Sequence, residues 1–223
     1  DGTPEGRARI PAIKSFKPPR LHSSAGLAGV WAEENTRESI FAALKRRETF
    51  ATSGPRISLR FFGAWDLGDK SSSNLIKRAY QNGVSMGGEL PPRQQEIAPE
   101  FLLWAMKAAD GVPLQRIQII KGWLEGGQTK EETYDAVCSD DLQVDPNTHR
   151  CPDNGAIVDL STCGISSDKG ASELSVRWRD PAFDATQSAF YYIRVLENPS
   201  CRWSSWEALR EGKPVFHDVS PVI

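Results

Sequence analysis

Ile57-Ser58-Leu59-Arg60-Phe61-Phe62 is the stretch that decides the fold class, because apolar and polar residues alternate along most of it. The turn-forming residues Ser53, Gly54 and Pro55 come shortly before it. A period of two is typical of a β-strand with one apolar face and one face in contact with water. The odd-numbered residues of the stretch are therefore expected on the apolar face and the even-numbered residues on the wet face.

Further segments have a similar strand-like composition and are bounded by Gly, Pro, Asn or Asp. They are residues 101–107, 116–123, 133–138, 173–179 and 189–196. Residues 101–108 also satisfy a helical stripe through Leu102, Leu103 and Met106, but we prefer a strand there. Several short strands separated by turns predict a mainly β chain, an antiparallel β-sandwich with a few short helices.

The predicted helices are short. Residues 1–30 are rich in Pro, Gly and basic residues and are expected to form an extended tail. The first helix is expected after Asn35, which forms a capping box with Glu38 and precedes an apolar stripe of Ile40, Phe41 and Leu44. Two more are expected at residues 75–81 and 206–210, the last capped by Ser204 or Ser205.

Composition excludes several functional classes. The 223 residues contain 27 Lys and Arg against 29 Asp and Glu, which gives a net charge of −2. A chain with so little net charge has no basic field to capture nucleic acid or an anionic membrane. No apolar run approaches the roughly 18 residues of a membrane span.

Four cysteines, Cys138, Cys151, Cys163 and Cys201, form no C-x-x-C pair, which favours disulfides over a metal site. Of the three possible pairings we prefer Cys138–Cys151, which closes an Asp- and Pro-rich loop, with Cys163–Cys201, which ties a later loop to the exit of a strand. Disulfides indicate an oxidising compartment, so we expect a periplasmic or secreted protein.

No catalytic machinery is visible in the sequence. His22, His149 and His217 are far apart, and the chain has no G-x-S-x-G elbow, P-loop or H-E-x-x-H motif. Residues 140–147 contain enough oxygen ligands for calcium but lack the Gly and the final Glu of an EF-hand, so an Asx-turn loop is preferred.

Two further groups of residues have alternative interpretations. The seven tryptophans fit a sugar-stacking surface, although Trp104, Trp123 and Trp178 lie on predicted strands and favour a core role. Arginine and threonine residues near the first helix include Arg47, Thr52 and Arg56. Guanidinium groups suit a phosphate or carboxylate, but charged helix ends explain most of this pattern equally well. In the alternative interpretation, Thr52 belongs to a turn and Arg56 starts a strand.

Two long motifs stand out near the first helix. They are Gly-Val-Trp-Ala-Glu-Glu-Asn-Thr-Arg-Glu at residues 29–38 and Lys-Arg-Arg-Glu-Thr-Phe-Ala-Thr-Ser-Gly-Pro-Arg at residues 45–56. Together with residues 86–88, 116–123, 180–184, 190–197 and 201–204, they strongly resemble the C-terminal part of the bacterial domain of unknown function 3604 family. These motifs cover nearly the whole chain in order.

Members of that family are similar to the PHP (polymerase and histidinol phosphatase) superfamily of metal-dependent phosphoesterases, which hold metals in an α/β barrel. The resemblance implies that residues 1–54 are a tail and the terminal helix of such a barrel, and that residues 55–223 are a β-sandwich domain. It also implies a divalent metal for the full-length protein and places Arg47, Thr52 and Arg56 near the substrate mouth.

The metal-binding motifs of that superfamily, His-x-His and a late Asp-x-His, do not occur between Asp1 and Ile223. We therefore expect no metal ligand, catalytic residue or cofactor in this chain itself. The expected partners are the barrel of the same protein and, in addition, a second copy of the chain. The alternative is an independent extracellular module that binds carbohydrate or protein.

Overall fold

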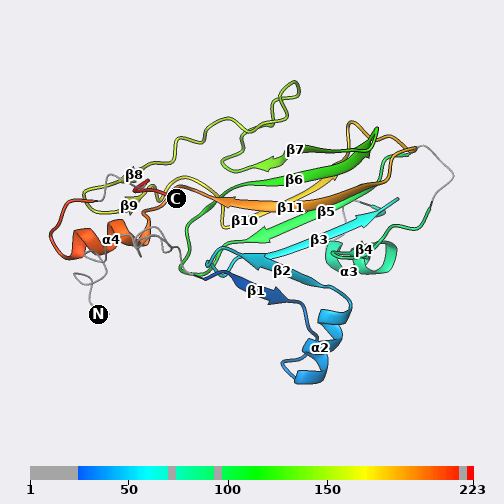
Figure 1. Cartoon of the computed structure of the whole chain (residues 1–223), viewed down its shortest axis with the longest axis horizontal. Helices are drawn as coiled ribbons and strands as arrows, with labels where there is room; N and C mark the ends of the chain where they lie inside the picture. Colours follow the sequence, from blue (N-terminus) through cyan, green and yellow to red (C-terminus); the bar gives the residue numbers. More distant parts are fainter. Residues whose placement is uncertain (1–24, 70–73, 93–96, 216–219) are drawn as a thin grey trace.

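A computed structural model describes residues 25–69, 74–92, 97–215 and 220–223. This part of the chain is mainly β, with antiparallel sheets and three short helices, which confirms the predicted fold class (Figure 1). No closed barrel is present among these residues. None of the described helices is both long enough and apolar enough to cross a membrane.

Two sheets form the sandwich. One has the strand order β10-β5-β3-β4, formed by Glu173–Arg179, Glu100–Met106, Ser58–Ala64 and Val84–Ser85. The other has the order β11-β6-β7, formed by Ala189–Glu197, Leu114–Glu125 and Gln128–Cys138. All neighbouring strands run antiparallel.

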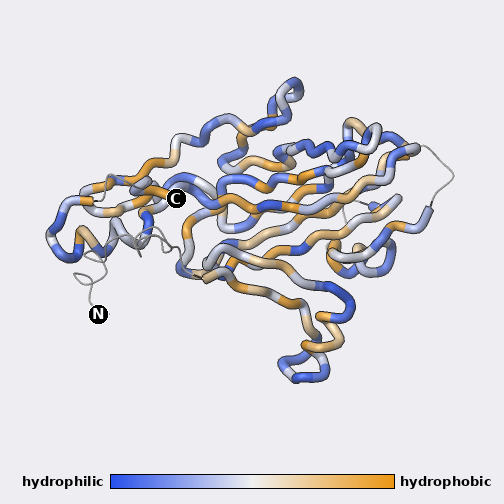
Figure 2. Tube along the Cα trace, viewed as in Figure 1, coloured by the Kyte–Doolittle hydropathy of each residue, from blue (hydrophilic) through white to orange (hydrophobic). Residues whose placement is uncertain are grey.

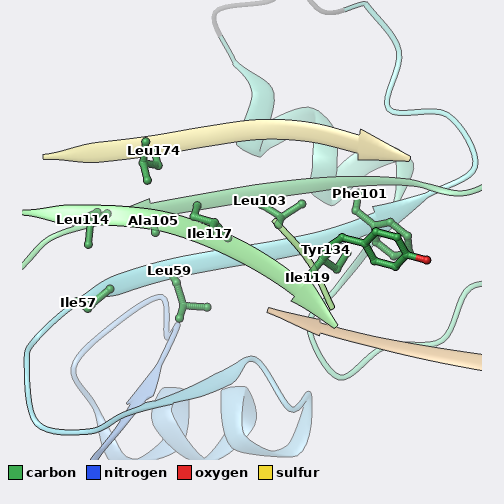
Figure 3. Packing of buried hydrophobic residues seen from close by; sticks show 10 residues of the cluster. All are labelled: Ile57, Leu59, Phe101, Leu103, Ala105, Leu114, Ile117, Ile119, Tyr134 and Leu174. Atoms are coloured by element: carbon green, nitrogen blue, oxygen red, sulfur yellow. The ribbon is translucent and has the colours of Figure 1, made fainter. Parts of the chain in front are cut away.

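The main core lies between these sheets, with buried side chains contributed by both (Figure 3). Hydrophobic and hydrophilic residues alternate along the strands, as the colours of Figure 2 show. This alternation places every second side chain in the core. The core residues are Ile57, Leu59, Phe101, Leu103, Ala105, Leu114, Ile117, Ile119, Tyr134 and Leu174.

The even-numbered side of β3 was expected to face water, but a second, smaller hydrophobic core lies there. The helix α3, Leu75–Asn82, packs on the outer face of the four-stranded sheet and buries Phe62, Ala64 and Leu102. Phe62 is only 1% exposed. The even-numbered side of β3 is thus largely covered, because an amphipathic helix from a later part of the chain lies over it.

A two-stranded ribbon carries the first helix on one side of the sandwich (Figure 1). Its strands are β1, Leu27–Val30, and β2, Thr49–Thr52, and α2, Arg37–Lys45, connects them. The end of the expected tail is therefore a strand, and residues 1–24 lie outside the described part. The ribbon is tied to the sandwich by Trp31, whose Nε1 donates to the Leu59 carbonyl oxygen at 2.8 Å.

Both predicted helix caps need correction. Thr36, not Asn35, is the N-cap of α2, and its hydroxyl accepts from the Ser39 backbone N–H at 3.3 Å. The last helix, α4, begins earlier than predicted and spans Trp203–Arg210. Ser204 and Ser205 therefore lie buried in its first turn and do not cap it.

The tryptophans also differ in part from the expected core role. Trp178 packs against the main core. Trp104 lies on the outer face, where its Nε1 donates to Glu173 at 2.6 Å, and Trp123 is half-buried near the end of β6. Position along a strand predicts the face of a side chain, but the depth of burial depends on what covers that end of the sheet.

Both predicted disulfides, Cys138–Cys151 and Cys163–Cys201, are present. The first joins β7 to the following loop. The second joins the loop between the short strands β8, Val158–Asp159, and β9, Gly164–Ile165, to the residues before α4. Two disulfides fit a protein of an oxidising, extracellular environment.

Loss of the Cys163–Cys201 disulfide, which closes the longer loop, is expected to destabilise the protein more than loss of Cys138–Cys151. Replacing Cys163 and Cys201 together by serine should lower the free energy of unfolding by about 2–4 kcal/mol, because a bridge across 38 residues restricts the unfolded chain more than one across 13. Urea unfolding of this variant and of the matched Cys138→Ser/Cys151→Ser variant measures the difference. A larger loss in the second variant would contradict the argument.

Candidate functional site

The described chain has a cleft of about 1010 Å³ between the sheets, on the side of β11. Its walls come from β2, β3, residues 84–92 and the start of β11. The opposite side of the sandwich is closed, because β10 lies against β7 there. The two sheets therefore converge along one side and leave a cleft along the other.

Aromatic side chains form much of the cleft lining. The rings of Phe61 and Phe101 stack with centroids 5.5 Å apart, and Tyr191 lies 4.5 Å from Phe101. Trp65 and Phe183 meet edge to face at 6.4 Å. Such a surface offers apolar contact area and flat ring faces to a ligand.

A buried ion pair lies beside these rings. Lys121 projects from β6 into the sandwich, and its Nζ lies 2.6 Å from Asp180 Oδ2 and donates to the Ala182 carbonyl oxygen at 2.6 Å. Tyr191, opposite Lys121 in the sheet register, donates its hydroxyl to the same Asp180 oxygen at 2.7 Å. Asp180 directly follows β10, so this cluster joins both sheets.

The phenol of Tyr191 remains neutral. Burial is the main cause that raises its pKa, and the hydrogen bond to the Asp180 carboxylate raises it further. The pKa of Tyr134, deeper in the core, is raised mainly by burial as well. Both groups therefore act as hydrogen-bond donors, and neither is suited to deprotonation as a nucleophile or base.

The rim of the cleft is acidic. Glu89 and Asp184 line it and are exposed, whereas the charge of Lys121 is compensated by Asp180. Asp184 accepts from the hydroxyl and backbone N–H of Thr186, and these bonds lower the pKa of its carboxyl. The rim consequently carries negative charge at neutral pH.

None of the three residues predicted near a substrate mouth lines the cleft. Arg47 precedes and Thr52 follows the three residues of β2 that form part of the wall. Arg47 is exposed and has a positive φ of 62°. Thr52 accepts from the Gly54 backbone N–H at 3.2 Å, and Arg56 is exposed beyond that turn. Their role in substrate binding stays a prediction.

The loop expected as an Asx-turn has that structure. Asp145 Oδ1 accepts from the backbone N–H groups of Asn147 and Thr148 at 2.8 and 2.9 Å. The Asp140 carboxylate accepts hydrogen bonds from the Gly170 backbone N–H, the Ser139 hydroxyl and the Asn154 side-chain amide. Within the described residues, no group of three or more His, Cys, Asp or Glu side chains is placed to hold a metal ion. His22 and His217 lie outside those residues.

Sequence reasoning missed the Lys121–Asp180–Tyr191 cluster. A signal for it exists, because Lys121 continues the buried series Ile117 and Ile119 at a period of two. A lysine on the inner face of a strand requires a buried acidic partner. Nothing in the sequence, however, indicates that Asp180 is that partner.

Fold and cleft together define a β-sandwich protein with an aromatic, acid-rimmed cleft. The family model described as "Protein of unknown function (DUF3604)" matches residues 5–223, so the chain belongs to this family. No curated protein and no solved structure is significantly similar to the chain.

Proposed function

We propose that the chain is the β-rich portion of a metal-dependent hydrolase related to the PHP superfamily, in a periplasmic or secreted protein. In this proposal the metal and the reacting groups belong to a barrel elsewhere in the same protein, and the sandwich packs on that barrel. Family membership over residues 5–223 and the motifs shared with that family support the proposal.

The exposed apolar surface of α2 is the structural observation that best supports this proposal. Phe41 is 61% exposed and Leu44 51% exposed, although both belong to the apolar stripe of the helix. Only Ala43 of this helix is buried. An amphipathic helix gains most of its stability by covering its apolar face. The proposed barrel supplies that cover and would bring Arg47, at the end of α2, close to its substrate.

Hydrolysis is expected to require more than residues 1–223. Metal hydrolase sites need about three converging protein ligands and an open position for water, and we find no such group in the parts of the chain described above. After chelation and reloading with zinc, manganese or iron, residues 1–223 should hold no stoichiometric metal and should not cleave phosphate mono- or diesters. The longer gene product that contains the barrel should do both.

Elemental analysis and phosphatase assays on the two proteins test this expectation. Stoichiometric metal in residues 1–223 together with turnover that disappears on chelation would contradict the proposal. A longer gene product that binds metal and remains inactive on every phosphate ester would leave the sandwich assignment intact and refute the hydrolase class.

An independent binding module is the second candidate. The cleft favours it, because aromatic rings such as Trp65 and Phe183 are combined there with polar rim groups. All seven tryptophans belong to the described residues and only Trp206 is exposed, so they give no support to a sugar-stacking surface.

A further inference from the structure

β11 forms a free edge along the cleft. It pairs only with β6, and none of the described strands pairs with its other side. Residues 188–193, from just before β11 into the strand, line the cleft. An unpaired edge of this kind presents backbone N–H and C=O groups that can pair with another strand.

The surface opposite this gap has the pattern of a sheet face that lacks its cover. Leu59, Phe61, Gly63 and Trp65 line the cleft from β3 and its end, and they are every second residue of the strand. The sheet that contains β3 has four strands, and the facing sheet has three. The cleft therefore lies where a fourth strand of the β11-β6-β7 sheet would complete the sandwich.

The dimensions agree with one extended segment. Six residues along the β11 side correspond to about 20 Å, at a rise of about 3.3 Å per residue. A strand added to β11 would lie about 4.8 Å from it, over β3 and β4. Its inward side chains would contact Phe61 and the other apolar residues of that face.

A second copy of the chain does not fit this gap through its own β11. Antiparallel pairing of two β11 strands about a two-fold axis places both four-stranded sheets on the same side of the joined sheet. In each copy β3, β4 and residues 84–92 extend beyond β11 to form the cleft wall. These overhanging elements would occupy the same space, so only a single strand can enter.

The negative charges at the cleft rim favour a bound segment that carries basic residues. Glu89 and Asp184 are exposed at the cleft, and Lys121, the one basic side chain of the lining, is ion-paired with Asp180. Trp65 contacts Pro91 and Phe183, so both carboxylates lie towards the same end of the cleft. A segment with lysine or arginine at that end meets them with opposite charge. Such complementarity speeds association and selects against acidic partners.

We propose that the cleft binds an extended peptide segment of another polypeptide, which adds to β11 as a fourth strand. The segment carries apolar residues at alternate positions, directed at the inner face of β3, and a basic residue at the end that meets Glu89 and Asp184, close to Trp65. Main-chain hydrogen bonds to β11 supply affinity, and the alternating apolar contacts set the register.

The test uses residues 1–223 and the synthetic peptide acetyl-Lys-Val-Thr-Val-Thr-Val-Lys-amide, with binding measured by calorimetry. Two N-methylated peptides distinguish the edges of the bound strand, because successive amides point to opposite sides. Methylation of the amides that face β11 is expected to weaken binding at least about tenfold, since several hydrogen bonds are lost. Methylation of the peptide amides that point away from β11 should change the affinity by less than about threefold. Equal effects of the two sets would overturn the proposal.

Reversal of the two rim charges tests whether the peptide binds in the cleft. The Glu89→Lys/Asp184→Lys variant should bind the peptide at least about tenfold more weakly. Because the peptide and the rim then carry charge of the same sign, added salt should no longer weaken its binding. The matched control is Glu131→Lys on β7, the other edge of the same sheet, which should bind as the unmodified chain does. A weaker peptide complex in Glu131→Lys alone would place the peptide at β7 and overturn the proposal.

Hydrogen exchange distinguishes strand addition to β11 from other ways of filling the cleft. The outward backbone amides of β11 should exchange rapidly in the free chain and become protected when the peptide binds. Protection before any peptide is added would mean that another segment of this chain already fills the gap. Binding without new protection in β11 would mean that the peptide contacts only the aromatic rings. Either result would contradict strand addition. None of these measurements depends on metal or hydrolysis, so their outcome is separate from that of the proposed function.

Discussion

Replacing Asp180 by alanine is expected to lower the free energy of unfolding by about 3–5 kcal/mol, because the change leaves a buried charge without its partner. The side chain of Lys121 is 3% exposed and that of Asp180 is fully buried. The Asp180 carboxylate also accepts the Tyr191 hydroxyl and the Ala182 backbone N–H. Its removal thus affects three groups, of which Lys121 and Tyr191 connect their sheet to the end of β10 in the other. Urea unfolding with the disulfides intact measures the loss.

A matched double variant separates the unpaired charge from the loss of packing. Lys121→Met together with Asp180→Leu removes both charges and keeps apolar volume, so it should be destabilised much less than Asp180→Ala alone. A loss below about 1 kcal/mol in Asp180→Ala would mean that water or another group reaches Lys121. In that case the cluster would not hold the sheets together.

Replacing Trp178 by alanine should also cost about 3–5 kcal/mol, the usual range for a large aromatic side chain that leaves a cavity. Its ring lies 6.0 Å from that of Phe101 and 5.4 Å from that of Tyr134, at the side where β10 meets β7. These contacts cannot be replaced without movement of both sheets.

Trp206 on α4 provides the control for this variant. Its side chain is 41% exposed and lies outside both hydrophobic cores. Trp206→Ala should therefore cost less than about 1 kcal/mol in the same urea experiment. Equal losses for the two variants would show that the depth of burial does not determine the contribution of these tryptophans.

The strands could be predicted from sequence because their signal is local. Residues 173–179 were expected as a strand and form β10 with the same bounds, since Leu174, Val176 and Trp178 alternate with polar residues. The ends of β6 and β7 extend beyond the predicted ranges. A hairpin lengthens there through pairing between strands, and pairing is not visible in either strand alone.

Features that depend on distant residues could not be predicted. Phe62 was expected on a wet face because nothing in its own strand announces α3. The choice between Asn35 and Thr36 as a helix cap depends on the backbone conformation at that turn, since both side chains are good caps. Long-range packing decided the first case, and the local backbone conformation decided the second.

The candidate site was the least predictable part. The sequence drew attention to Arg47, Thr52 and Arg56, none of which lines the cleft, whereas about half of the lining residues belong to several separate strands. A cleft that opens because two sheets contain different numbers of strands has no local motif. Its existence follows from sheet pairing, which a single sequence does not reveal.

The contact between α2 and a metal-binding barrel is the central claim of the functional proposal, and hydrogen exchange tests it most directly. The α2 amides should exchange at least about tenfold more slowly in the longer gene product than in residues 1–223, because burial of Phe41 and Leu44 stabilises the helix. Substitution of both residues by glutamate should abolish this difference. Equal exchange of α2 in the two proteins would contradict the proposed docking.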